Sequence, residues 1–164
     1  MTQGGNSEIG AIKVRRAVPE DSDTIVRFNS AMALETESKT LVEEQLREGV
    51  AAMFNRQGLG FYCVAEVAGR MVGQLMITTE WSDWRNSHYW WIQSVYVEPE
   101  YRRTGVYRTL HNFVATEAQD QGDVQGLKLY VDRDNKRAQR VYFSLKMNHS
   151  NYDLWEIDFR AAHS

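Results

Sequence analysis

The segment from His88 to Glu98 most constrains the fold, because it carries large apolar side chains at both odd and even positions. Successive side chains of a strand point to opposite faces of its sheet. One face would then carry Tyr89, Trp91, Gln93, Val95 and Val97, and the other Trp90, Ile92, Ser94 and Tyr96. A strand that is apolar on both faces is covered on both sides. The segment therefore predicts an inner strand of a sheet that has helices on both faces.

The other elements follow from the spacing of apolar residues and from the turn residues between them. Alternation predicts further strands at 11–18, 61–67, 71–79, 127–131 and 152–159. Helical spacing predicts helices at about 21–33, 38–57, 106–121 and 135–146. Because strands and helices do not alternate strictly, this order predicts mixed α/β layers rather than a doubly wound fold.

Composition narrows the class of protein. A net charge of −3 and a pI near 5.8 lack the basic excess of nucleic-acid-binding proteins, so we expect no nucleic-acid partner. No stretch approaches the ~20 apolar residues of a membrane span, so we expect no membrane partner and a cytoplasmic protein. Cys63 is the only cysteine and lies in the apolar run 61–65, which indicates a buried side chain rather than a disulfide or a metal ligand.

The expected domain organisation is simple. Residues 1–10 are polar and glycine-rich, which is typical of a flexible terminus. Residues 11–164 contain no repeat, low-complexity tract or linker, and this length fits one domain.

A basic loop follows the inner strand, which Pro99 ends. The loop from Arg102 to Arg108 contains Gly105 and opens directly into a helix. Backbone N–H groups at a helix N-terminus have no partner within the helix and favour an anion, and glycine lets a phosphate approach the backbone. The loop therefore predicts a pyrophosphate cradle, although by itself it also fits a solvated, charged turn. It matches neither a P-loop nor a dinucleotide fingerprint.

Two motifs resemble those of the GNAT superfamily of acetyl-CoA-dependent N-acetyltransferases. The family's Val-x-Pro-x-x-Arg and Arg/Gln-x-x-Gly-x-Gly/Ala correspond to residues 97–102 (Val-Glu-Pro-Glu-Tyr-Arg) and 102–107 (Arg-Arg-Thr-Gly-Val-Tyr). Its Asn-x-x-Ala-x-x-x-Tyr pattern matches Asn135, Ala138 and Tyr142. One departure bears on the site, because Tyr107 stands where the family usually has a small residue.

The resemblance implies a GNAT-like α/β (α+β) fold with a mixed, mostly antiparallel sheet of about six to seven strands flanked by helices. It implies an acyl-CoA-dependent N-acyltransferase that uses acetyl-CoA as cosubstrate, needs no metal, and passes the acetyl group directly to a primary amine. The cofactor-binding residues that it implies are Val95, Tyr96, Val97, Arg102, Arg103, Thr104, Gly105, Val106, Tyr107, Arg108, Asn135 and Tyr142.

Two tasks of the reaction are assigned by the same resemblance. Backbone amides around Val95 to Val97, where a bulge typically splays the strand, would polarise the thioester carbonyl. Tyr142, whose phenol has a pKa of about 10, would act as the general acid for the departing thiolate. The competing interpretation of Tyr142 is a core residue on the apolar stripe of its helix.

The acceptor side is less defined. Gln93 stands where relatives often carry a glutamate base, and an amide cannot take a proton. The candidate bases are Glu80 and Glu35, and the candidate acceptor-binding residues are Glu35, Glu37, Glu80, Trp81, Asp83 and Trp84. Each carboxylate also fits a solvated surface charge, and a well-placed water could serve as the base instead. The aromatic segment 80–91 fits a wall of the acceptor pocket or a subunit interface, so a homodimer stays open.

Two other functions compete with acetyl transfer. A CoA-binding sensor or interaction module with the same fold and no turnover is favoured by Tyr107 and Gln93. A nucleotide-dependent enzyme could use the same basic loop for phosphate.

Overall fold

The computed structural model describes residues 10–160. The chain divides into two compact units at Tyr130 and Val131, and each unit is described by itself. All but one residue of the terminus expected to be flexible, 1–10, lie outside the described part. The prediction of a single domain over 11–164 stays a prediction.

The first unit contains all five strands and most of the helices. The strands are β1 (Ile12–Arg16), β2 (Gly60–Val67), β3 (Arg70–Ser82), β4 (Ser87–Val97) and β5 (Val124–Leu129). The helices are α1 (Ser22–Glu37), α2 (Glu43–Asn55) and α3 (Val106–Gln121), with short 3-10 turns η1 (Pro19–Asp21) and η2 (Pro99–Tyr101). The second unit contains α4 (Lys136–Ser144). Each predicted helix is present, with ends that differ by a few residues.

The sheet is mixed, as predicted, and its strands follow one another in the order β1-β2-β3-β4-β5. The first four strands pair antiparallel and β5 runs parallel to β4. Within residues 10–160 the sheet has five strands instead of the expected six to seven. β4 lies inside the sheet, between β3 and β5, as its sequence predicts.

The predicted strand at 152–159 is wrong. The described part of the second unit contains no strand, and the alternating side chains of this segment are exposed: Tyr152, Leu154, Trp155, Ile157 and Phe159. A strand is defined by hydrogen bonds to a neighbouring strand, so alternation of side chains cannot create one without a ladder partner.

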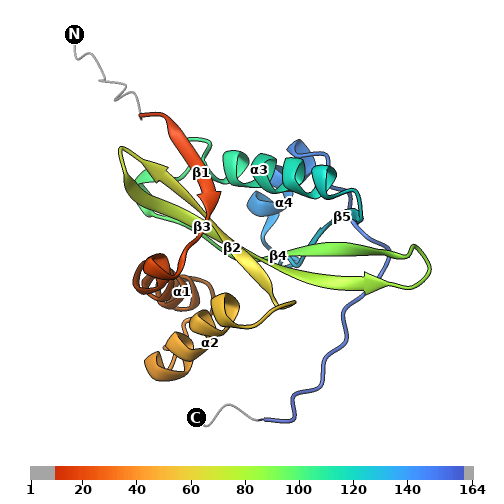
Figure 1. Cartoon of the computed structure of the whole chain (residues 1–164), viewed down its shortest axis with the longest axis horizontal. Coiled ribbons are helices and arrows are strands. Elements are labelled where there is room, and N and C mark those ends of the chain that lie inside the picture. Colours follow the sequence, from red (N-terminus) through yellow and green to blue (C-terminus); the bar gives the residue numbers. More distant parts are fainter. Residues whose placement is uncertain (1–9, 161–164) are drawn as a thin grey trace. The chain divides into compact units, whose positions relative to one another are not determined.

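Helices cover both faces of the sheet in the first unit (Figure 1): α1 and α2 lie on one side and α3 on the other. The core on the α3 side joins α3 residues such as Leu110 to Leu75 and Ile77 of β3. A smaller core on the other side joins Ile25 of α1 to Val50 of α2. The two cores explain why the inner strands carry apolar residues at successive positions.

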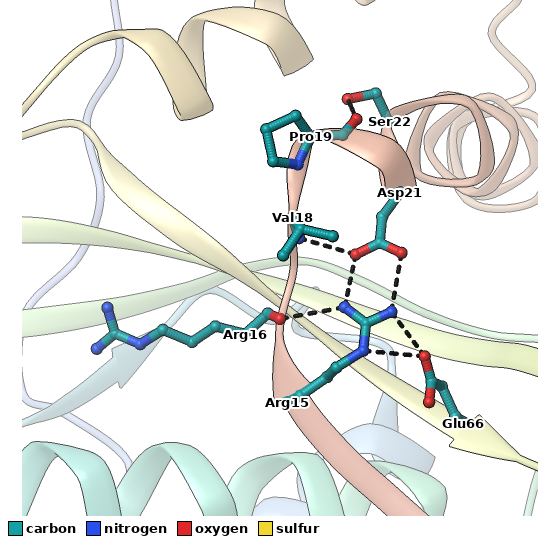
Figure 2. A network of polar contacts seen from close by, with 7 residues as sticks. All are labelled: Arg15, Arg16, Val18, Pro19, Asp21, Ser22 and Glu66. Carbon is teal, nitrogen blue, oxygen red and sulfur yellow. Dashed lines mark hydrogen bonds and ion pairs between the residues drawn. The ribbon is translucent and has the colours of Figure 1, made fainter. Parts of the chain in front are cut away.

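One arginine fixes the start of α1 against the edge of the sheet (Figure 2). The Arg15 guanidinium donates to both carboxylate oxygens of Asp21, at 2.7 and 2.9 Å, and to Glu66 of β2 at 2.6 and 3.0 Å. The backbone N–H of Val18 donates to the same Asp21 carboxylate at 2.8 Å. These contacts fix the turn between β1 and α1, and the Arg15 hydrogen bonds lower the pKa of Asp21 below its ordinary value.

We predict that Asp21→Asn lowers the free energy of unfolding by about 1.5–3 kcal/mol at pH 7, because it removes a charge-assisted bidentate contact. A lowered pKa in the folded state contributes stability above the unfolded pKa of about 3.9, and this contribution is lost as pH falls through the folded value. The difference between wild type and variant should therefore shrink below about pH 4 in urea unfolding. Asp23→Asn is the matched control, because the exposed Asp23–Arg47 pair should contribute at most about 1 kcal/mol. An equal loss from both variants would contradict the prediction.

Candidate active site

A β-bulge interrupts β4 at the place where the sequence predicts the carbonyl-polarising amides. Gln74 of β3 pairs with Tyr96, whereas Met76 pairs with Gln93. Two residues of β4, Ser94 and Val95, therefore lie opposite one residue of β3. Ser94 has a φ of 50°, which is uncommon for a residue other than glycine. The bulge itself was a prediction from resemblance alone, because nothing in the residue pattern reveals it.

The bulge corrects the predicted faces of β4. Strict alternation would leave Val95 and Val97 on the face of Trp91 and Gln93, but both valines pack against the α3-side core together with Trp90. Tyr96 takes the opposite face, where its ring centroid lies 4.9 Å from that of Phe28 in α1. One extra residue reverses the alternation, because the side-chain period of a strand is two.

The pairing between β4 and β5 ends next to the bulge. Their ladder runs from the pair His88–Val124 to the pair Ile92–Leu129. Within the described residues, the part of β4 from Gln93 to Val97 pairs with β3 and with no other strand. The backbone of β4 thus lacks a strand partner on its β5 side over the bulge and the residues that follow it.

The end of β4 is anchored by a buried carboxylate that the sequence analysis missed. Glu98 is 4% exposed and accepts hydrogen bonds from Arg27 of α1 at 3.1 Å and Arg70 of β3 at 2.6 Å. Two arginines from different elements satisfy this buried charge. They fix the point at which the chain leaves the sheet for the basic loop.

The loop leads into the N-terminus of α3, which packs against the sheet. Gly105 precedes the helix with a φ of 96°, and a Cβ built there would meet no atom within 4 Å. Gly73 of β3 lies under the first turn, where a Cβ would come within 2.9 Å of Val106. A missing side chain thus permits the close approach of α3, and the open space above Gly105 leaves its N-terminal turn accessible.

The predicted cradle residues have distinct surroundings. Arg103 is exposed with a φ of 66°, and the hydroxyl of Thr104 donates to the Tyr101 carbonyl at 2.6 Å. Arg108 is exposed, and Tyr107 is half-buried with its ring 6.2 Å from that of His111. The loop, the glycine and the start of the helix thus form one continuous basic segment.

Arg102 is engaged by residues of β4 and α1. Its Nε donates to the Val97 carbonyl at 2.8 Å, and its Nη2 donates to Glu35 at 2.7 Å. The guanidinium carbon lies 5.5 Å from the ring centre of Tyr96. Arg102 thereby ties the end of α1 to the strand just after the bulge. Glu37, also predicted on the acceptor side, is exposed and pairs with Lys39.

Glu80 lies elsewhere in the sheet. Its two oxygens accept hydrogen bonds from Trp91 Nε1 at 2.6 Å and from Lys128 Nζ at 2.8 Å. The Lys128 ammonium also lies 3.9 Å from the ring centre of Tyr89. The hydrogen bond from Lys128 is the main reason that the pKa of Glu80 lies below its ordinary value. A carboxylate with both oxygens engaged and a lowered pKa is a weak base.

The remaining predicted acceptor residues cluster around the β3–β4 turn. Trp81 and Trp84 are 55% and 89% exposed, and Asp83 accepts the backbone N–H of Trp84 at 2.9 Å. Glu80 pairs with Tyr89, seven residues along β4 from Tyr96, or about 20 Å at the usual rise of a strand. The structure therefore does not bring Glu80 and its neighbours together with Glu35.

The second unit holds the other two predicted site residues. The Asn135 side chain accepts the backbone N–H of Ala138 at 3.0 Å, which caps the start of α4. Tyr142 lies on α4, half-buried, and its burial raises the pKa of its phenol. A raised pKa keeps this hydroxyl protonated at neutral pH, as a general acid requires.

Three further findings bear on the chemistry. Cys63 is fully buried, and burial raises the pKa of its thiol to about 12, so it is a core residue, as predicted. Within residues 10–160, no three or more acidic, histidine or cysteine side chains form a group suited to a metal ion. No helix in the same part of the chain has the length and apolar character needed to span a membrane.

The comparisons agree with this geometry. Residues 28–145 match the acetyltransferase (GNAT) family. The solved structure of a possible acetyltransferase from Clostridium difficile 630 is 40% identical, covers 93% of this chain and 99% of its own, and has a TM-score of 0.85. The chain therefore belongs to the acetyltransferase (GNAT) family, as its two motifs predict. A search of the curated proteins gives no match.

More distant solved structures share the fold. A predicted acetyltransferase with acetyl-CoA from Clostridium acetobutylicum is 15% identical over 94% of this chain and 100% of its own, with a TM-score of 0.75. A ribosomal-protein-alanine N-acetyltransferase from Brucella melitensis biovar Abortus 2308 is 14% identical over 92% of this chain and 100% of its own, with a TM-score of 0.74. At these identities the likeness concerns the fold alone.

The positive φ of Ser94 predicts that stability responds unusually to substitution at this position. Ser94→Val should lower the free energy of unfolding by about 1–3 kcal/mol, because a β-branched residue is strained at positive φ. Ser94→Gly should change it by less than about 1 kcal/mol, because glycine adopts this conformation readily. Ser82→Val in β3, where φ is not positive, is the control and should cost little. If urea unfolding finds valine and glycine equivalent at position 94, the assigned backbone conformation is wrong.

Proposed function

We propose that this chain is an N-acetyltransferase that transfers an acetyl group from acetyl-CoA to a primary amine by direct attack of the amine on the thioester. The observation that carries the proposal is the bulge of β4 beside the end of the β4–β5 ladder, which leads into the basic loop and the N-terminus of α3. The bulge, the loop and the helix N-terminus follow one another along the chain. The proposed acyl site at the bulge and the proposed anion site at the helix N-terminus therefore belong to one continuous segment.

The donor side of the proposal rests on the loop and on the open edge of β4. The N-terminal N–H groups of α3, the open space above Gly105 and the exposed side chains of Arg103 and Arg108 suit a pyrophosphate. The residues from Val95 to Val97 offer backbone groups with no strand partner on the β5 side, which suits the amide-containing arm of CoA. Arg102 holds the end of β4 in place rather than serving mainly as a phosphate ligand.

The chemistry needs an oxyanion donor and an acid. A backbone N–H at the bulge, around Val95 to Val97, would stabilise negative charge on the thioester oxygen during attack, and an oxyanion-hole donor typically contributes about 3–4 kcal/mol. Tyr142 would donate its proton to the departing sulfur. The C–S bond breaks, the C–N bond forms, and CoA leaves as the thiol. Buried Cys63 is unsuited to form an acyl-enzyme, which agrees with direct transfer.

On the acceptor side we favour Glu35 over Glu80 as the base. Among the described residues, one oxygen of Glu35 accepts a hydrogen bond, from Arg102. Both oxygens of Glu80 accept hydrogen bonds, from Trp91 and Lys128. Arg102 also links Glu35 to the strand beside the bulge, where the amine must attack. The carboxylate would attract an ammonium acceptor and receive its proton directly or through a water. Gln93, whose amide donates to Thr78 at 2.6 Å, can orient an acceptor but cannot deprotonate it.

The decisive experiment is the release of CoA thiol from acetyl-CoA with a panel of small primary amines, amino acids and peptides with free N-termini. Release that depends on an amine, with the acetylated amine found by mass spectrometry, supports the proposal. Binding of CoA without release in the presence of any amine supports the non-catalytic sensor instead. Thermal stabilisation by ATP and not by CoA would favour the nucleotide-dependent alternative.

The two glycines that flank α3 provide a matched test of the cradle. Gly105 and Gly122 have φ of 96° and 76°, and a Cβ at either would meet nothing within 4 Å. Valine should strain both positions by about 1–3 kcal/mol, but only Gly105→Val places a side chain where the phosphates are expected. We predict that Gly105→Val weakens CoA binding at least ~10-fold in calorimetry, equivalent to about 1.4 kcal/mol, whereas Gly122→Val leaves it nearly unchanged. Equal effects would refute the placement of the cradle.

Tyr142→Phe tests the general acid. Loss of the hydroxyl should lower kcat by ~10²-fold or more, with CoA binding within a few-fold of wild type, because a proton is withheld only in the transition state. Tyr152→Phe is the control, because Tyr152 is 89% exposed in the same unit. Single-turnover kinetics should measure the effect, so that product release does not mask it. An unchanged chemical step would remove Tyr142 from the mechanism.

A further inference from the structure

A buried network of polar side chains connects α1 to the β4 bulge. Gln74 of β3 is 0% exposed, and its Nε2 donates to the Asn29 side chain of α1 at 2.7 Å and to the Ser94 carbonyl at 3.4 Å. Asn29, itself 5% exposed, donates to the Tyr62 hydroxyl of β2 at 3.3 Å. The network therefore connects one helix and three strands, and it ends on the bulge residue that has positive φ.

The position of Gln74 is costly for stability. Its Oε1 is buried with no hydrogen-bond partner in the described part of the chain, and such an orphaned acceptor lowers stability. Met76, two residues along β3, packs against the smaller core on the α1 and α2 side of the sheet. An apolar side chain at position 74 would pack the same core without this penalty. A polar group retained at such a cost suggests a task other than holding the core together.

The register of the sheet places Gln74 beside the bulge of β4. Gln74 is the residue of β3 at which the pairing with β4 shifts, since it faces Tyr96 while Met76 faces Gln93. Its amide reaches the carbonyl of Ser94, the residue that turns the chain into the bulge. Because a strand can slip or flatten at a bulge, a hydrogen bond to the turned carbonyl limits the orientations of the peptide groups that follow.

We propose that Gln74, held by Asn29, is a positioning residue for acyl transfer: it fixes the β4 bulge so that the backbone amides after Ser94 point at the thioester oxygen. The inference rests on the proposed function. It assigns Gln74 no contact with either substrate, and its effect passes through the peptide groups of residues 94–96. An oxyanion donor acts only when it is preorganised, so looser peptides should slow the chemical step more than they weaken binding.

The test separates positioning from stability. Replacing both amides by apolar side chains, in the double variant Asn29→Leu/Gln74→Met, removes the orphaned Gln74 oxygen and both members of the Gln74–Asn29 hydrogen bond. The gain from removing the orphaned oxygen should largely offset the loss of the long Asn29–Tyr62 hydrogen bond, so we expect an unfolding transition close to that of wild type. We expect kcat for thiol release to fall about 10- to 100-fold, below the 10²–10³-fold typical of losing an oxyanion donor outright, with the KM for acetyl-CoA within about threefold.

A matched control distinguishes a loosened bulge from a loosened core. Val114→Ala removes volume from a fully buried position of α3, in the core on the other side of the sheet, and should lower stability with little change in kcat. Hydrogen exchange gives a readout that does not depend on activity: the amides of residues 94–96 should exchange at least ~10-fold faster in the double variant, and as in wild type in the Val114 variant.

Each outcome bears on one hypothesis. A double variant with wild-type kcat overturns the positioning role. So does a fall in kcat that only matches a loss of stability and that Val114→Ala reproduces. If wild type releases no thiol with any amine, the proposed acetyl transfer fails, and the exchange rates still decide whether Gln74 fixes the bulge. Unchanged exchange at residues 94–96 overturns the inference in either case.

Discussion

The site depends on one extra residue in β4. By placing Ser94 and Val95 opposite a single residue of β3, the bulge reverses the alternation of side chains in the last part of the strand. Val95 and Val97 then enter the α3-side core, and Tyr96 packs under α1. The same irregularity lies beside the end of the β4–β5 ladder, so within the described residues β4 has no strand partner on that side where its backbone is turned. The packing of the core and the unpaired edge of β4 thus meet at the bulge.

Several contacts within the first unit hold the surroundings of the bulge in place. Glu98 fixes the end of β4 through Arg27 and Arg70, Arg102 ties the loop to Glu35 of α1, and Gly73 lets α3 approach the strands. A functional site on loops alone would be less precise, because loops carry fewer fixed contacts. Here a loop of charged residues is held at both ends by buried contacts, which suits the binding of a large anionic ligand in one orientation.

The sequence predicted most of the fold and the position of the basic loop before α3, whereas the roles of the cofactor-binding residues stay predictions. The two-sided apolar pattern of residues 88–98 identified β4 as an inner strand, and the loop motif marked the start of α3 at Gly105. Alternation failed in two ways: it continued through the bulge, whose extra residue leaves no trace in the pattern, and it predicted a strand at 152–159 where no ladder partner is described. Glu98 and Gln74 were missed because burial of a polar residue depends on partners distant in sequence. Their local signals, an acidic residue before Pro99 and an amide between apolar neighbours, acquire meaning only in three dimensions.

The acceptor residues show why composition cannot replace geometry. Glu35 and Glu80 are equivalent in sequence, as carboxylates at the ends of apolar elements. In the structure Glu80 pairs with Lys128 and accepts a hydrogen bond from Trp91 beside the aromatic rings of the sheet, whereas Glu35 lies at the end of α1 and pairs with Arg102, which also contacts β4. Each carboxylate thus has one cationic partner, and the difference lies in the second oxygen: that of Glu80 accepts from Trp91, whereas among the described residues Glu35 has one oxygen engaged. Under the proposed function, Glu35 is therefore the better candidate to receive the proton of an amine that attacks beside the bulge.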